Sequence, residues 1–213
     1  MPKHRNQFNS SRVPKFSVIM PSRLTPYPGC AKRLDRKLIR AIESVLKQSF
    51  TELELIVISD ECNITKRIVS TYFTDERLKL LECKHKVLFD NLPRNTGINE
   101  AIGDYIIYLD IDDYWGEDHL KIVENNLDNW EWVWFNDFHF VGQWMERACN
   151  IRAKSGSGTS NICHKRSLEL RWDRPGYAHD YYFTQKLLTF KGMKIETPEY
   201  FVCHIPGRGG YDL

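Results

Sequence analysis

Three carboxylates stand within four residues at Asp110, Asp112 and Asp113, directly after the apolar run 105–109. The run is rich in aromatic and β-branched residues, so it predicts a buried strand with the acids at its carboxyl end. Open α/β sheets bind ligands at that end of their strands. Neighbouring carboxylates raise each other's pKa unless a cation offsets them, and hard divalent ions prefer oxygen ligands. The cluster therefore suggests a site for a hard divalent cation, against the alternative of a solvated acidic turn capping a helix that begins near Gly116.

Alternating strand and helix patterns must position this cluster. Apolar runs predict strands at 16–20, 53–58, 78–82 and 105–109, and helical spacing of apolar residues predicts helices at 35–48, 64–73 and 95–102. This alternation is typical of a largely parallel sheet covered by helices on both faces. Beyond Trp115 the pattern loosens to a helix at 119–127, an aromatic strand at 130–135, a helix at 181–190 and a late strand at 200–203. We expect this irregular half to be adapted to a particular substrate.

Length and charge favour one α/β domain. The 213 residues, of which 42% are hydrophobic, can bury one substantial core. Thirty basic against 28 acidic side chains give a formal charge of +2, so the composition does not indicate nucleic acid binding. Residues 1–15 carry basic but no acidic side chains and lack apolar periodicity, so we expect them to form a disordered tail.

Cysteine usage and hydropathy predict a cytoplasmic protein. The six cysteines show no Cys-x-x-Cys spacing, which disfavours a zinc site or a redox motif and fits reduced thiols. No apolar stretch reaches the roughly 18 residues that a transmembrane helix needs, and no signal peptide precedes Phe16. We therefore expect no transmembrane segment.

Four segments in order resemble the family 2 glycosyltransferases, GT-A-type enzymes that transfer a sugar from a nucleotide diphosphate donor. They are FSVIMP at 16–21, AIESVLKQ at 41–48 with ELIVISD at 54–60, RNTG at 94–97 through AIGDYI at 101–106, and LDIDDYW at 109–115. The resemblance implies one GT-A-type domain with a Rossmann-like sheet. Residues 16–115 would form its nucleotide-sugar-binding half, and 116–213 its acceptor-binding and catalytic half.

The resemblance also implies the donor site. Asp60 can accept the imide N–H of a uracil or thymine ring, although an Asp here can instead cap the following helix. Arg94 can offer a fork of donors to the diphosphate or the base, or form a salt bridge at a helix start. The family usually has two acids followed by Gly-Ser where this chain has 59–62, SDEC. The implied donor-binding residues are Pro21, Ser22, Asp60, Arg94, Asp110 and Asp112.

The resemblance to this family implies a divalent cation as well. Mg²⁺ or Mn²⁺ bridging two phosphates acts as a Lewis acid on the departing diphosphate. Asp112 and Asp113 are the expected metal ligands, and the division of work among the three acids stays open. His204 could add an imidazole to the metal or contact a phosphate, and Arg208, among glycines, could close over the diphosphate.

Inverting transfer, which the resemblance implies, needs a general base near the acceptor hydroxyl. Asp180 is the candidate, because it matches the second residue of the family's late acidic pair, which is His179-Asp180 here, and precedes a predicted helix. The alternative for Asp180 is a helix cap. Asp137, just after the aromatic strand, is the competing base. The acceptor can be a glycan, a lipid-linked glycan or a protein-linked one.

Three other functions share part of this pattern. A sugar-phosphate nucleotidyltransferase should have a glycine-rich, lysine-bearing loop after the first strand, and 21–25, PSRLT, is not such a loop. A metal-dependent phosphatase or nuclease would also cluster aspartates. A non-catalytic nucleotide-sugar-binding module would keep the fold without transfer.

Overall fold

The computed structural model describes residues 13–84, 91–154, 156–176, 178–196, 199–204 and 213. Its strands are β1 (Phe16–Ser22), β2 (Leu53–Asp60), β3 (Leu78–Cys83), β4 (Tyr105–Tyr108), β5 (Tyr114–Trp115), β6 (Trp132–Phe135), β7 (Asp137–Phe140), β8 (Trp144–Arg147), β9 (Ile162–Lys165), β10 (Gly192–Ile195) and β11 (Tyr200–Val202). Its helices are α1 (Leu34–Leu46), α2 (Asn63–Tyr72), α3 (Leu92–Glu100), α4 (His119–Asn125) and α5 (His179–Leu187), with 3₁₀ turns η1 (Thr159–Asn161) and η2 (Arg166–Leu168).

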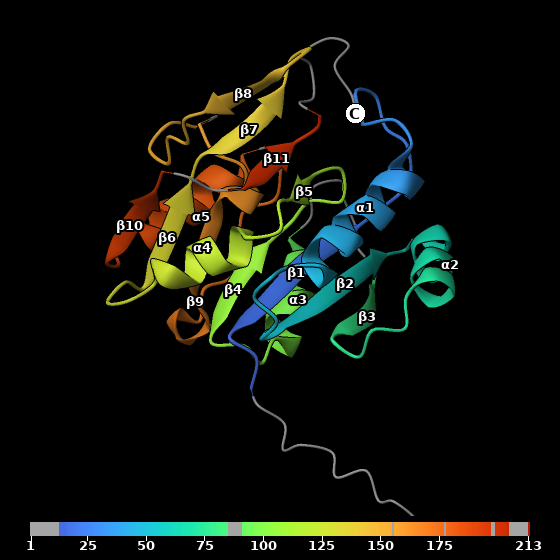
Figure 1. Cartoon of the computed structure of the whole chain (residues 1–213), viewed down its shortest axis with the longest axis horizontal. Coiled ribbons are helices and arrows are strands. Elements are labelled where there is room, and N and C mark those ends of the chain that lie inside the picture. The colour runs from blue at the N-terminus through green and yellow to red at the C-terminus, as the bar shows by residue number, and fades with distance from the viewer. Residues whose placement is uncertain (1–12, 85–90, 155, 177, 197–198, 205–212) are drawn as a thin grey trace, which may run out of the picture.

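A seven-stranded sheet in the order β10-β6-β9-β4-β1-β2-β3 forms the centre of the molecule (Figure 1). Within it β4, β1, β2 and β3 run parallel, as do β10 and β6, and only β9 runs antiparallel to its neighbours. The mostly parallel α/β sheet predicted from the sequence is confirmed. The sheet is continuous across the two predicted halves of the chain, since β6, β9 and β10 come from the second half.

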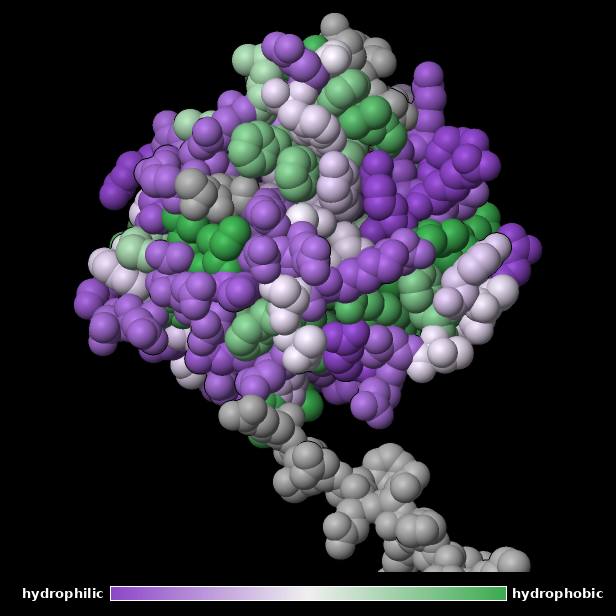
Figure 2. Space-filling model, in the orientation of Figure 1, coloured by the Kyte–Doolittle hydropathy of each residue, from purple (hydrophilic) through white to green (hydrophobic). Residues whose placement is uncertain are grey.

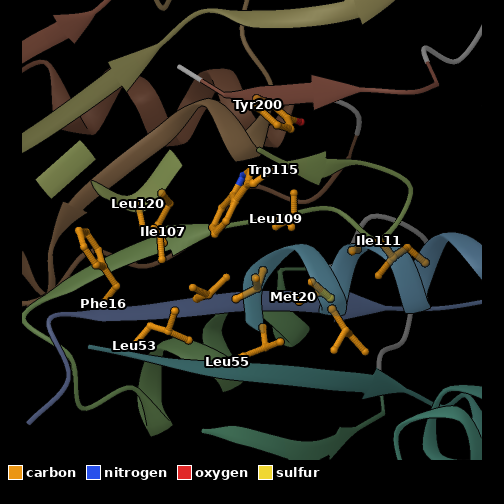
Figure 3. Close-up of a cluster of buried hydrophobic side chains, with 14 of the residues drawn as sticks. Phe16, Met20, Leu53, Leu55, Ile107, Leu109, Ile111, Trp115, Leu120 and Tyr200 are labelled. Carbon is orange, nitrogen blue, oxygen red and sulfur yellow. The ribbon is translucent and has the colours of Figure 1, made fainter. Parts of the chain in front are cut away.

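Helices cover both faces of this sheet, as expected. Side chains alternate between two apolar clusters, so that Val18 belongs to the cluster under α1, α2 and α4, and Ile19 to the cluster under α3 and α5. Figure 3 shows the first cluster, in which side chains of β1, β2 and β4 point toward α1 and meet Leu120 of α4. Gly97 of α3 permits close packing, because a Cβ there would lie 2.7 Å from Ile19 Cγ2.

A smaller sheet, in the order β5-β11-β7-β8, packs through aromatic rings. The Phe201 ring stacks on Tyr114 at 4.9 Å and on Phe138 at 5.5 Å between centroids, and Trp144 meets Phe201 edge-on at 5.2 Å. Figure 2 shows hydrophilic residues over most of the visible face, with paler and apolar residues gathered over this small sheet. The rings hold the β7–β8 hairpin, and with it Arg147, beside the main sheet.

Every helix and strand predicted between residues 16 and 109 is present, with end points displaced by up to three residues. The largest displacement is at α3, which begins at Leu92 because a proline is favourable in the first helical turn. In the second half, α4, β6, α5 and β11 correspond to the four predicted elements. Five strands were not predicted from the sequence, and each is only two to four residues long: β5, β7, β8, β9 and β10.

Two predictions concern residues outside the described part of the chain: the basic tail, apart from residues 13–15, and Arg208. Among the described residues, none of the helices combines the length and apolar character that a bilayer span requires.

Candidate functional site

A cavity of about 440 Å³ opens at the carboxyl ends of β1, β2 and β4. The parallel register aligns these ends, pairing Ser22 with Ser59 and Ile19 with Tyr108. All but one of the residues predicted for the site line the cavity, namely Pro21, Ser22, Asp60, Arg94, Asp110, Asp112, Asp113, Asp180 and His204. The exception is Asp137. The structure thus gathers residues from both ends of the sequence into one space.

Asp60 lies at the end of β2 with most of its surface buried. Its Oδ2 lies 4.0 Å from Arg23 Nη1, and its Oδ1 accepts a weak hydrogen bond from Cys83 Sγ at 3.6 Å. The N-cap of α2 is Cys62, with no side-chain capping bond. The capping alternative for Asp60 is therefore not observed, and its carboxylate belongs to the cavity wall.

Arg94 is fixed by a carboxylate and an aromatic ring. Its Nη2 donates to Asp110 Oδ1 at 3.3 Å, and its guanidinium carbon lies 5.2 Å from the centre of the Trp172 ring. Asn95 anchors that tryptophan by two hydrogen bonds to its backbone, at 2.7 and 2.9 Å. A guanidinium held in one plane is suited to anionic oxygens, which it can meet with two parallel N–H groups.

The three acids after β4 have different surroundings. Asp110 pairs with Arg94, whereas Asp113 is only 4% exposed and accepts hydrogen bonds from Tyr200 Oη at 2.5 Å and from the Cys203 amide at 3.0 Å. Burial and the nearby Asp112 charge raise the pKa of Asp113 well above its usual range. Both carboxylate oxygens of Asp113 thus tie the acidic loop to β11. Asp110 and Asp112 also line the cavity, and their carboxylate oxygens make no such hydrogen bonds to β11.

We expect Tyr200→Phe to lower the free energy of unfolding by about 1–3 kcal/mol, because it leaves a buried carboxylate oxygen without its donor. For a chain of this size each kcal/mol lowers the melting temperature by about 2–4 °C. Thermal unfolding of the two proteins measures the change. Tyr72→Phe is the matched control, since Tyr72 is 65% exposed. A Tyr200→Phe protein that melts with the wild type would contradict a structural role for the Asp113–Tyr200 bond.

Asp112 faces the cavity and carries a perturbed carboxyl group. Burial, together with the charge of Asp110, raises the pKa of Asp112 to about 6, while Coulombic interactions with His204 and Lys37 act to lower it. Its backbone carbonyl accepts a hydrogen bond from Arg40 Nη2 at 3.0 Å, which fixes the loop. Crowded carboxylates of this kind are stabilised by a bound cation.

The acidic cluster fits a cation that is also held by phosphates. Within the described residues, no group of three or more His, Cys, Asp or Glu side chains converges as a metal cage. Mg²⁺ is usually bound through one or two carboxylates plus substrate phosphates, so Asp110 and Asp112 suffice for it. His204 also lines the cavity, where its Nε2–H donates to the Gly29 carbonyl at 2.8 Å.

Asp180 lies in the first turn of α5, which begins two residues earlier than expected. The N-cap is Ala178, so Asp180 does not occupy the cap position. Asp180 instead binds one amide of the first helical turn. Its Oδ1 accepts a hydrogen bond from the Tyr181 amide at 2.7 Å. Burial raises the pKa of Asp180 to about 6, with Asp110 adding to the rise and Arg94 opposing it.

The neighbouring His179 is neutral at pH 7, because burial lowers its pKa to about 4. Its Nδ1 lies 2.8 Å from the Gly176 carbonyl and can only donate there, which leaves Nε2 to accept from Thr159 Oγ1 at 3.4 Å. His179 therefore connects η1 to α5 and adds no positive charge beside Asp180.

Asp137, the competing base, is only 1% exposed and lies outside the cavity lining. Its carboxylate accepts hydrogen bonds from Arg147 Nε at 2.9 Å, Arg147 Nη2 at 2.7 Å and Asn161 Nδ2 at 2.9 Å. Of the two candidates, only Asp180 has a carboxylate that faces the space where an acceptor can bind.

The cavity also contains residues that the sequence reading did not single out. Arg147 and Lys154 line it from the second half of the chain, and Arg23, Tyr27 and Leu34 from the first. The sequence contains no signal for Arg147, because its strand was not predicted and its partner Asp137 is ten positions away on a different strand.

Comparison with known proteins identifies a family and relatives of this chain. The model of glycosyl transferase family 2 matches residues 30–141, just over half of the chain. The UDP-Glc:alpha-D-GlcNAc-diphosphoundecaprenol beta-1,3-glucosyltransferase WfgD of Escherichia coli is 30% identical over 138 residues, covering 61% of this chain and 50% of WfgD. The poly(ribitol-phosphate) beta-N-acetylglucosaminyltransferase TarP of Staphylococcus aureus is 35% identical over 124 residues, covering 54% of this chain and 35% of TarP. The chain thus spans half or less of the length of these relatives.

The fold is similar to that of a solved structure, S. aureus TarS 1–349 in complex with UDP-GlcNAc. The TM-score is 0.70 at 20% sequence identity, covering 92% of this chain and 61% of that one. This likeness shows the GT-A fold. Together with the match over residues 30–141, it leads to one conclusion: the chain belongs to glycosyl transferase family 2.

Proposed function

We propose that the protein transfers a sugar from a UDP-sugar to an acceptor hydroxyl, with inversion at the sugar and with the help of Mn²⁺ or Mg²⁺. The observation that carries the proposal is the single cavity into which Asp60, the Asp110–Asp112 pair and Asp180 all face. These side chains provide a base-recognition group, a cation site and a general base, which are the parts that such a transfer needs.

The donor would lie along the carboxyl ends of β1, β2 and β4. Asp60 can accept the N3–H of uracil, and Arg94 can donate to the diphosphate from its fixed plane. Two related proteins support uridine as the nucleoside, since WfgD is described as using UDP-Glc and TarS was solved with UDP-GlcNAc.

Asp110 and Asp112 would hold the divalent cation, with His204 near them. When bound, the cation would supply Lewis-acid stabilisation of the diphosphate leaving group. Asp113 was expected among its ligands, but its two oxygens already accept hydrogen bonds from Tyr200 and Cys203. We therefore propose that Asp113 positions the loop that carries Asp112.

Asp180 would take the proton of the acceptor hydroxyl as the hydroxyl oxygen attacks the sugar. A pKa of about 6 keeps the carboxylate ionised at pH 7 and leaves it more basic than an ordinary aspartate. Neutral His179 cannot compete as an acid beside it. A glycan or lipid-linked glycan is the proposed acceptor, in line with the diphosphoundecaprenol acceptor in the name of WfgD.

The cytoplasm is the proposed compartment. All six cysteines are free thiols, with Cys62, Cys149, Cys163 and Cys203 buried. Free thiols are typical of proteins kept in a reducing compartment, whereas secreted domains usually pair them.

The proposal is tested by thermal unfolding with UDP, ADP, CDP and GDP, each with and without Mn²⁺. A ligand at about 100 times its Kd stabilises the native state by about 2.7 kcal/mol. We expect UDP with Mn²⁺ to raise the melting temperature most. Equal shifts from all four nucleotides, or none, would contradict the proposed donor. Steady release of inorganic phosphate from the nucleotides would favour the phosphatase alternative.

Uracil recognition by Asp60 has its own test. Asp60→Ala should weaken UDP binding about 10- to 100-fold, because a hydrogen bond to a charged group contributes about 1.5–3 kcal/mol. Its preference for UDP over ADP should fall by the same factor. Calorimetric titration measures both affinities, and Asp128→Ala, at an exposed position outside the cavity, is the control. An unchanged preference would remove Asp60 from the base site.

A further inference from the structure

The cations around the cavity differ in how their charge is balanced. Arg23 and Arg94 each lie near a carboxylate that also lines the cavity, Asp60 at 4.0 Å and Asp110 at 3.3 Å. Arg147 pairs instead with Asp137, which is buried behind the wall. Lys154 forms no ion pair with any residue in the described part of the chain. Arg147 and Lys154 therefore line the cavity without forming an ion pair with another cavity-lining carboxylate among the described residues.

Arg147 is held in one orientation and keeps unused donors. Asp137 binds its Nε and Nη2, and Asp137 is itself fixed by Asn161, whose Nδ2 also donates to the Phe135 carbonyl at 3.0 Å. The third nitrogen, Nη1, makes no hydrogen bond to a described residue. The Arg147 side chain is 33% exposed, whereas Asp137 is almost fully buried. Arg147 also lines the cavity, so its unused edge is available to a ligand there.

The position of these cations separates them from Asp60, at the uracil end of the proposed nucleotide site. Arg147 ends β8, and Lys154 precedes the segment 157–159, which also lines the cavity. Figure 1 shows β8 and α5 well away from β2 and β3, where Asp60 lies. Hydrogen bonds run from Arg147 through Asp137 and Asn161 to η1, and from Thr159 of η1 to His179, the neighbour of Asp180. Arg147 is therefore connected to the wall that carries the proposed general base, where the acceptor would approach, and Lys154 lines the same cavity just ahead of η1 in the chain.

We propose that Arg147 and Lys154 form an anion subsite that binds a phosphate group of the acceptor, so that the acceptor substrates are phosphate esters of sugars or polyols. This inference rests on the proposed transferase function. A planar guanidinium that offers two N–H groups, joined by a flexible ammonium, is suited to the tetrahedral oxygens of a phosphate. A neutral glycan would place no anionic oxygen against the unused Nη1 of Arg147 or against Lys154.

The test is a calorimetric titration of the full chain saturated with UDP and Mg²⁺, so that the nucleotide site is occupied. The ligands are N-acetylglucosamine 1-phosphate and ribitol 5-phosphate, each compared with its phosphate-free parent. We expect at least one ester to bind more tightly than its parent, and the better ester to indicate whether the acceptor is a sugar phosphate or a polyol phosphate. Its affinity should fall as the salt concentration rises, because exposed charges are screened.

Two variants assign the effect to this subsite. Lys154→Gln, at an exposed position, should weaken ester binding about 3- to 10-fold, and Arg147→Lys, which keeps a charge beside Asp137 but loses the planar fork, should weaken it about 10-fold. Arg152→Gln is the matched control, because Arg152 is exposed two residues from Lys154 and does not line the cavity. Thermal unfolding of each variant shows whether it is folded.

The results separate this inference from the proposed function. If UDP binds but no ester binds better than its parent, or if both variants bind the ester like the wild type, the anion subsite is refuted and the transferase proposal stands. If UDP itself does not bind with Mg²⁺, the proposed function fails first. Loss of ester affinity in both variants, with Arg152→Gln unchanged, supports the subsite.

Discussion

Asp180→Asn should lower kcat by about 10²- to 10⁴-fold while UDP affinity stays within about twofold of the wild type. The proposed base acts only on the acceptor proton, so its loss removes a step of the reaction and no contact to the donor. Asparagine has nearly the same size and can still accept the Tyr181 amide hydrogen bond, so α5 should remain intact. The measurement is transfer from UDP-sugars to a panel of lipid-linked and glycan acceptors, with UDP binding measured in parallel.

The pH dependence gives an independent check on Asp180. A base with a pKa of about 6 works only when ionised, so kcat should fall by about tenfold for each pH unit below 6 and level off above it. Asp112 also has a pKa of about 6, but its protonation should weaken metal-dependent UDP binding and so appear in the donor affinity. Measuring kcat and the affinity for UDP separately from about pH 5 to pH 8 distinguishes the titration of Asp180 from that of Asp112.

Two controls accompany Asp180→Asn. Asp173→Asn changes an aspartate seven residues before Asp180 in the sequence. Asp173 is 58% exposed and lies outside the cavity, so turnover should not change. Asp137→Asn should lower thermal stability, because it weakens the buried pair with Arg147. If Asp180→Asn turned over normally and a folded Asp137→Asn protein did not, the base would be misassigned. Normal turnover in both would refute the stated mechanism.

Asp112→Asn should remove the metal-dependent part of UDP binding, a loss of at least about 10- to 100-fold in the presence of Mn²⁺. Mutating the hydrogen-bond partners of a metal ligand typically weakens metal binding by about 10- to 100-fold, and removing the ligand itself should weaken it at least as much. The fold should persist, since uncharging a crowded carboxylate relieves repulsion from Asp110. Calorimetric titration of UDP with Mn²⁺ and with a chelator measures the difference.

Asp118→Asn is the matched control for Asp112→Asn, because Asp118 is an exposed aspartate six residues after Asp112. Its metal dependence should equal that of the wild type. If Asp112→Asn kept its full response to Mn²⁺ and Asp113→Asn lost it, the division of roles between these two acids would be reversed.

The sequence was sufficient to predict the helices and strands between residues 16 and 109 because their signals are local. Each of β1, β2 and β4 is a buried apolar run that ends in polar residues, and parallel pairing brings those ends together. The position of Asp60 and the acidic cluster in one cavity followed from that rule, whereas Arg94, in α3, was expected there from the family resemblance. Helix ends were less well predicted, since α3 starts with Leu92 and Pro93, ahead of its apolar periodicity.

The roles of individual acids could not be predicted, because they depend on partners far away in the sequence. Asp112 and Asp113 are adjacent and chemically identical, but only Asp113 is bound by Tyr200, 87 positions later. Asp137 follows an apolar strand as Asp110 does, yet it is turned into the core by Arg147 and Asn161. The antiparallel β9, four residues long, pairs with β4 and β6 with no local signal to mark it.

The central claim is that UDP and a divalent cation bind together in the cavity at the ends of β1, β2 and β4. The most direct test is a crystal structure of the chain with UDP and Mn²⁺, with the metal located by its anomalous scattering. We predict one manganese peak at about 2–2.5 Å from a carboxylate oxygen of Asp112, bridging to the diphosphate, with the uracil against Asp60. A manganese peak elsewhere, or UDP bound outside this cavity, would contradict the account.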